Sequence, residues 1–101
     1  MSKLDTVELQ ATDVRFFSQC DEAAFFEWIK KLSFIQKIEG RGRTLYLLVN
    51  RAAIDEDALR ELLALFHRFE IDLRQLAVFD REEFVEWFRN KNAYWHSEIF
   101  K

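Results

Sequence analysis

The second half of the chain repeats one local pattern three times: an apolar residue, an aspartate, and a second apolar residue four positions after the aspartate. The copies begin at Ile54-Asp55, Ile71-Asp72 and Phe79-Asp80. An aspartate immediately before a helix accepts a hydrogen bond from a backbone N–H that has no partner within the helix. The two apolar residues contact each other across the helix start and fix the angle at which the chain enters. The pattern predicts three separately started helices joined by short corners.

The spacing of apolar residues sets the expected extent of these helices. The predicted ranges are 56–69, 73–78 and 81–89, with a last turn or two after the break at residues 90–92.

Residues 73–78 are also compatible with a strand, because Leu73, Ala77 and Phe79 would share one face. We favour the short helix. Gln75 stands three positions after Asp72, where a capping box places its second member, and Ile71 and Leu76 supply the matching apolar contact.

The first half of the chain combines strand and helix signals. Apolar and polar residues alternate over 7–11, which predicts a strand with one buried face, and residues 14–17 are a candidate extension of it. Apolar residues recur at helical spacing over 19–32, preceded by Ser18 and Asp21 as a capping box. This segment is predicted to be a helix.

Two β-prone runs, 34–39 and 43–50, flank the glycine-containing loop 40–42, which predicts a hairpin. The second run has apolar residues on both faces and is expected to be the central strand. The predicted order is β-α-β-β-α-α-α. We therefore expect an α+β fold, with a small antiparallel sheet of three to four strands and helices packed on it, as a single domain over 1–101.

Several features bear on localisation. No apolar run approaches the roughly 18 residues of a membrane span, and residues 1–5 lack the apolar core of a signal peptide. The single cysteine, Cys20, excludes an internal disulfide and suits a reducing compartment. The expectation is a cytoplasmic protein without membrane contact.

The charge is distributed unevenly along the chain. The net charge is −3, yet residues 30–51 carry six basic side chains and one acidic one. Lys37, Arg41 and Arg43 surround the glycine loop and are candidate anion-binding residues for phosphate or RNA. However, the loop joins strand to strand and lacks the ending of a phosphate-binding loop. A solvated turn is therefore favoured, and nucleic acid is not the expected partner.

Catalytic and metal-binding patterns are missing from the sequence. His67 and His96 have no second ligand at metal-binding spacing. Cys20 is followed by two acidic residues, which oppose thiolate formation, and has no nearby histidine to activate it. We expect no catalytic residues, no metal, no cofactor and no small-molecule substrate.

The aromatic residues are more numerous than regular elements can bury. Phe16 and Phe17 are adjacent, as are Phe25 and Phe26, so both members of a pair cannot face one core. Trp87, Tyr94 and Trp95 lie away from the apolar stripe of the third helix or beyond its end, near Glu82 and Glu86. Tryptophan and tyrosine are enriched at protein interfaces. These five C-terminal residues predict an aromatic and acidic binding surface.

The leading hypothesis is a small non-enzymatic protein-interaction domain. It would self-associate as a homodimer, or bind or inhibit a protein partner, through Trp87, Tyr94, Trp95, Glu82 and Glu86. The alternative is phosphate or RNA binding through the basic hairpin 30–51. Clustering of five of the six basic residues of this segment on one face would favour that alternative. The five are Lys30, Lys37, Arg41, Arg43 and Arg51.

Overall fold

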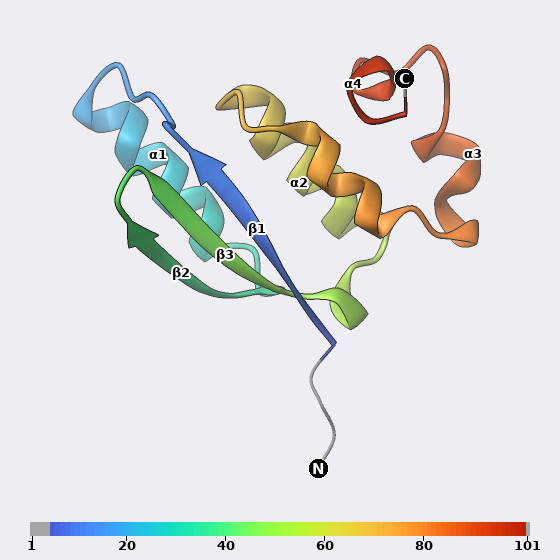
Figure 1. Cartoon of the computed structure of the whole chain (residues 1–101), viewed down its shortest axis with the longest axis horizontal. Helices are drawn as coiled ribbons and strands as arrows, with labels where there is room; N and C mark the ends of the chain where they lie inside the picture. Colours follow the sequence, from blue (N-terminus) through green and yellow to red (C-terminus); the bar gives the residue numbers. More distant parts are fainter. Residues whose placement is uncertain (1–4, 101) are drawn as a thin grey trace.

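A computed structural model describes residues 5–100 and shows three antiparallel strands in the spatial order β1-β3-β2. They are β1 (Thr6–Thr12), β2 (Ile35–Arg41) and β3 (Thr44–Asn50). Helices pack on this sheet (Figure 1), so the predicted α+β class is confirmed. Residues 1–4 and 101 of the domain predicted over 1–101 lie outside the described residues. They include most of the segment 1–5 that lacks the apolar core of a signal peptide.

The helical elements follow the predicted order with two differences: an additional 3-10 turn follows β3, and the third predicted helix is divided. They are α1 (Gln19–Lys30), the 3-10 turn η1 (Arg51–Ala53), α2 (Glu56–Arg68), the 3-10 helix η2 (Leu73–Phe79), the 3-10 turn η3 (Glu82–Phe84), α3 (Val85–Phe88) and α4 (His96–Ile99). The helix predicted over 81–89 is divided between η3 and α3. The last predicted turn is α4.

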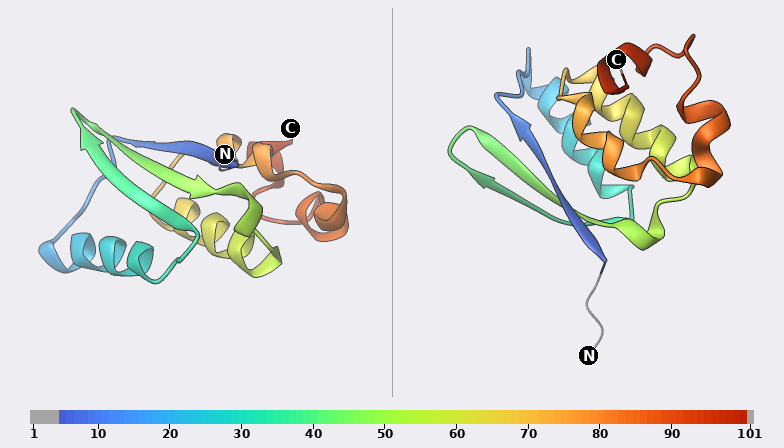
Figure 2. Two further views of the ribbon diagram at one scale, coloured as in Figure 1. Left: turned by 90° about the horizontal axis from the view of Figure 1, so that it is seen from below. Right: turned by 45° about the vertical axis from the view of Figure 1, so that its right-hand side comes forward.

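The sheet and the two long helices form a split β-α-β arrangement, in which β3 lies between β1 and β2. Both α1 and α2 cover the same face of the sheet (Figure 2, left). Leu9, Leu47 and Val49 are fully buried on that face, whereas Tyr46 and Leu48 lie on the opposite face and are half-buried. The predicted central position of the second hairpin strand is confirmed.

The ends of the strands are set by two residues with left-handed backbone. Gly42 (φ 61°) begins the two-residue loop that joins Arg41 to Thr44. Asp13 (φ 56°) turns the chain out of the sheet after β1, and its N–H donates to the Arg43 carbonyl (2.8 Å). The predicted extension of the first strand over 14–17 is therefore wrong.

A side chain occupies the place where a fourth strand would pair. The Gln10 N–H donates to Gln75 Oε1 (2.8 Å), and Gln75 Nε2 donates to the Gln10 carbonyl (2.7 Å). The amide of Gln75 thus reproduces the two bonds of a strand neighbour at the middle of β1. The helical assignment of 73–78 is confirmed, although Gln75 donates to the Asp72 carbonyl rather than closing the predicted capping box.

Two of the three aspartate caps are present. Asp55 accepts from the Ala58 N–H (2.8 Å), and Asp72 accepts from the Arg74 N–H (3.0 Å). The side chain of Arg74 also donates to Asp72 and lowers the pKa of that carboxyl. Ser18 caps α1 by accepting from the Asp21 N–H (3.1 Å).

The predicted cap at Asp80 is wrong. Its carboxylate accepts hydrogen bonds from the Arg89 guanidinium, with Nε at 3.0 Å from Oδ2. The residue preceding η3 is Arg81, which makes no side-chain cap. A guanidinium offers two charge-assisted donors in a plane that matches the carboxylate, and such bonds are stronger than one to a backbone N–H.

Removal of the Asp55 carboxylate should lower the free energy of unfolding by about 0.5–2 kcal/mol, the usual effect of losing a helix cap. The Ala58 N–H, at the start of the longest helix, would lose its acceptor. Urea denaturation of Asp55→Ala measures this, and Asp55→Asn, which keeps an acceptor, is the control. Equal midpoints for wild type and Asp55→Ala would contradict the cap.

Candidate functional site

The structure places Trp95, one of the predicted surface residues, in the core. The side chain is 8% exposed, and its Nε1–H donates to the Phe88 carbonyl (2.7 Å). Its ring lies edge-on to Trp87 and Tyr94, with centroids at 6.0 and 4.9 Å. The ring is buried in the contact between α3 and the segment before α4. The prediction that Trp95 lies on an exposed surface is therefore wrong.

Trp87 is also largely covered. The Arg60 guanidinium of α2 lies over its ring, 4.2 Å from the centroid. The indole N–H of Trp87 is buried and has no hydrogen-bond partner within residues 5–100. Such a covered ring stabilises the contact between α2 and α3 and leaves little area for a partner.

Tyr94 is the exposed member of the predicted aromatic group. It is 48% exposed, and one face of its ring lies against His67 of α2 at a centroid distance of 4.4 Å. Partial burial raises the pKa of the Tyr94 hydroxyl. Glu82 and Glu86 are exposed and form no ion pair within the described part of the chain. Only Tyr94 and these two carboxylates remain as surface groups.

The basic hairpin residues each have a carboxylate nearby. Arg43 Nε lies 2.6 Å from Asp13 Oδ1, and this bond raises the pKa of Arg43. Lys37 lies 3.8 Å from Glu39. Arg41 lies 3.8 Å from Glu8 and stacks over the Tyr46 ring at 4.1 Å. Local neutralisation of this kind weakens attraction for an anion.

The wider basic segment does not gather on one face. Lys37 and Arg41 lie on the open face of the sheet, whereas Lys30 ends α1, which covers the other face. Arg43 and Arg51 lie at opposite ends of β3, a strand of seven residues and so roughly 20 Å apart. The clustering that would favour an anion site is not observed.

Phe17 is the most exposed large apolar side chain of the described residues, at 80%. Its neighbour Phe16 turns inward, with ring centroids 5.4 Å from Phe25 and 6.1 Å from Phe69. The Phe17 backbone is nevertheless held, because its N–H donates to Asp21 Oδ2 (3.0 Å). The adjacent pair Phe16-Phe17 was the sequence signal for this exposure, although the prediction placed the binding surface elsewhere.

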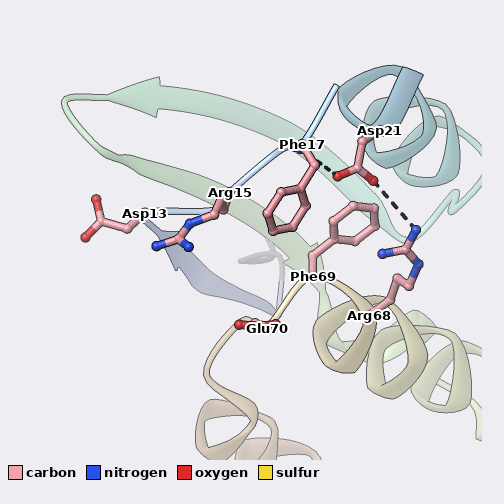
Figure 3. A pocket seen from close by; sticks show the side chains of 7 residues that line it. All are labelled: Asp13, Arg15, Phe17, Asp21, Arg68, Phe69 and Glu70. Atoms are coloured by element: carbon pink, nitrogen blue, oxygen red, sulfur yellow. Dashed lines mark hydrogen bonds and ion pairs between the residues drawn. The ribbon is translucent and has the colours of Figure 1, made fainter. Parts of the chain in front are cut away.

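A hollow of about 180 Å³ lies beside Phe17 and is lined by charged residues from three segments. Figure 3 shows Arg15 on one side of it and Arg68 on the other, with Phe17 between them. Asp21 is neutralised by Arg68 (3.6 Å). Arg15 and Glu70 form no ion pair within residues 5–100, so both charges remain available at the rim.

Two left-handed residues shape this hollow. Asp13 and Glu70 (φ 58°) are the non-glycine residues with positive φ in the described part of the chain, and both line it. Glu70 follows the end of α2, where the Ile71 N–H donates to the Phe66 carbonyl (2.8 Å) and closes a common helix-ending motif that usually contains glycine. The walls of the hollow are therefore fixed by backbone geometry.

No cluster of three or more histidine, cysteine, aspartate or glutamate side chains able to hold a metal ion occurs within residues 5–100. Cys20 is free and exposed. Among the described helices, none has both the length and the apolar character needed to cross a membrane.

Comparisons of the chain with known protein families, with curated proteins and with solved structures gave no match.

Proposed function

We propose that the chain is a cytoplasmic, non-enzymatic protein-interaction domain whose contact surface is centred on Phe17. We call Phe17, Arg15, Arg68 and Glu70 the Phe17 surface. The main support for this proposal is that the Phe17 side chain is 80% exposed while its backbone N–H donates a hydrogen bond to Asp21. The lone cysteine Cys20 is the support for a reducing compartment.

The energetics favour Phe17 as an anchor. Burying an exposed phenylalanine side chain contributes about 1.5–3 kcal/mol. A residue whose backbone is already ordered loses less conformational entropy on binding than one in a loose loop. The charges of Arg15 and Glu70, which form no ion pair within residues 5–100, lie at the rim, where they can orient a partner and set its association rate.

Tyr94 is a weaker candidate for the same role. Its ring contacts His67 on α2 and Trp95 in the core, so part of its area is already buried. This makes Tyr94→Ala a matched control for Phe17→Ala: each change removes one exposed aromatic ring, from two different surfaces.

The Phe17→Ala substitution should weaken partner binding by about tenfold or more, as removal of an interface anchor does. The test is affinity capture from lysate on the full chain, with retained proteins quantified for wild type, Phe17→Ala and Tyr94→Ala. A protein retained by wild type and Tyr94→Ala, and lost with Phe17→Ala, is then purified and its dissociation constant measured against all three chains.

The controls separate binding from folding and from the alternative site. Phe17→Ala should leave the urea midpoint close to wild type, because an exposed side chain contributes little to stability. Equal affinity of the purified partner for wild type and Phe17→Ala would reject the Phe17 surface. Loss of binding in Arg41→Ala and Arg43→Ala, with Phe17→Ala unaffected, would support the basic hairpin instead.

A further inference from the structure

Strand β2 is the open edge of the sheet. It pairs with β3 on one side, and Figure 1 shows no element of residues 5–100 alongside its other side. The opposite edge, β1, is covered at its middle by the Gln75 amide. An uncovered edge presents unpaired backbone N–H and C=O groups to any strand that can approach it.

The backbone groups that β2 presents can be identified from the register. The backbone N–H and C=O of Gln10 bond to Gln75 and therefore point away from β3. Gln10 lies opposite Tyr46 on β3, so the backbone groups of Tyr46 point away from β1, toward β2. Tyr46 pairs with Glu39, which therefore faces β3. The register of β2 shifts at a bulge between Ile35 and Lys37. From Lys37 onward successive residues alternate, so Ile38 and Gly40 direct their backbone groups outward.

We propose that two copies of this chain pair antiparallel through their β2 edges, about a two-fold axis at Ile38, to form a continuous six-stranded sheet. Ile38 of each copy would exchange both backbone hydrogen bonds with Ile38 of the other. This proposal uses a surface separate from the Phe17 surface and does not depend on it.

The charges of β2 select this register. With the axis at Ile38, Lys37 lies directly opposite Glu39 of the second copy, and the same pair forms again on the other side of the axis. Lys37 and Glu39 of one chain are already 3.8 Å apart on the open face. The four side chains would form a ring of alternating charge, in cross-strand pairs that bring side chains closest together.

The neighbouring registers place like charges opposite each other. With the axis at Lys37, the Lys37 side chains of the two copies face each other. With the axis at Glu39, the two Glu39 side chains face each other, and Lys37 faces Arg41 of the other copy. An axis at Gly40 pairs Glu39 with Arg41 of the second copy, but it also sets Lys37 against Arg43, a residue of the turn that is no longer part of the strand. Like charges directly opposite destabilise a strand pair. Registers between these would set outward backbone groups against inward ones and cannot form a ladder.

The other face of the proposed pair is apolar. Ile38 is half-buried and packs against the hydrophobic core beneath the sheet. Two Ile38 side chains meeting at the axis would join the cores of the two copies. Gly40 has no side chain to obstruct a second backbone, and close approach of another backbone is one of the reasons for a glycine within a strand.

Sedimentation equilibrium of the full chain at several hundred micromolar is the first measurement. Wild type should show a monomer–dimer equilibrium, and because the ladder is short we expect a weak dimer. Lys37→Glu and Glu39→Lys should each weaken the dimer about tenfold or more. In each single variant, residues 37 and 39 carry the same charge, and they face each other at two places in the dimer. The double variant Lys37→Glu/Glu39→Lys should restore wild-type affinity. Lys91→Glu, the same charge change far from β2, should have no effect.

A mixture of the two single variants makes the test specific for the register. Each variant by itself should be monomeric, whereas an equimolar mixture should dimerise, because every opposed pair at the axis is then again lysine against glutamate. Circular dichroism verifies that each variant is folded. A wild-type chain that stays monomeric, a dimer unaffected by either single variant, or a mixture that does not associate would each overturn the proposal.

Discussion

Replacement of Trp95 by alanine is expected to lower the free energy of unfolding by about 3–5 kcal/mol, the cost of removing a large aromatic side chain from a packed core. The indole is 8% exposed and lies against Trp87, Phe88 and Tyr94. The substitution also leaves the Phe88 carbonyl without its hydrogen-bond donor. Urea denaturation followed by circular dichroism gives the difference.

Two comparisons identify the source of that loss. Trp95→Phe keeps an aromatic ring but removes the indole N–H, so it should lose clearly less than Trp95→Ala. Phe17→Ala removes a ring that is 80% exposed and should change stability by less than about 0.5 kcal/mol. If Trp95→Ala were as stable as wild type, the ring would have to be accessible, and its assignment to a binding surface would return.

Arg81→Ala is expected to lower the free energy of unfolding by about 2–3 kcal/mol, since hydrogen bonds to charged groups contribute more than neutral ones. The Arg81 guanidinium donates to the carbonyls of Ile54 (2.9 Å) and Arg51 (2.5 Å), and its side chain is only 28% exposed. It thereby ties the segment before η3 to the connection between β3 and α2. We place the value below the sum of two such bonds because water can replace part of the interaction.

Arg81→Lys is the matched control for this prediction. Lysine keeps the positive charge but lacks the planar fork that reaches two carbonyls at once. It should therefore recover part of the loss, and less than the whole. Recovery of full stability by lysine would show that charge, rather than the two hydrogen bonds, is what matters at this position.

Local signals predicted the elements of the fold. The caps at Ser18, Asp55 and Asp72 involve partners two or three residues away, so they can be read from spacing. Asp80 has the same sequence pattern, yet its carboxylate binds Arg89, nine residues later. Competition between a near and a distant partner is decided by how the chain packs, and spacing does not encode that.

The candidate site was harder to predict for the same physical reason. Adjacent phenylalanines indicated that some ring must be exposed, and Phe17 is that ring. Which other aromatics are covered depends on contacts between distant segments. Arg60 covers Trp87, and His67 covers one face of Tyr94, in both cases from α2. The spacing of apolar residues within the C-terminal segment does not show which of its rings side chains of α2 will cover.

The side chain of Gln75 bears on how many copies of this sheet can join. In the language of polymer chemistry, a sheet with two receptive edges is bifunctional and can propagate without limit, edge to edge. Gln75 blocks the middle of one edge by occupying the bonds of Gln10, which leaves a monofunctional unit. Two monofunctional units that join have no reactive end left. The amide of one glutamine therefore acts as a chain terminator, and an assembly through β2 stops at two.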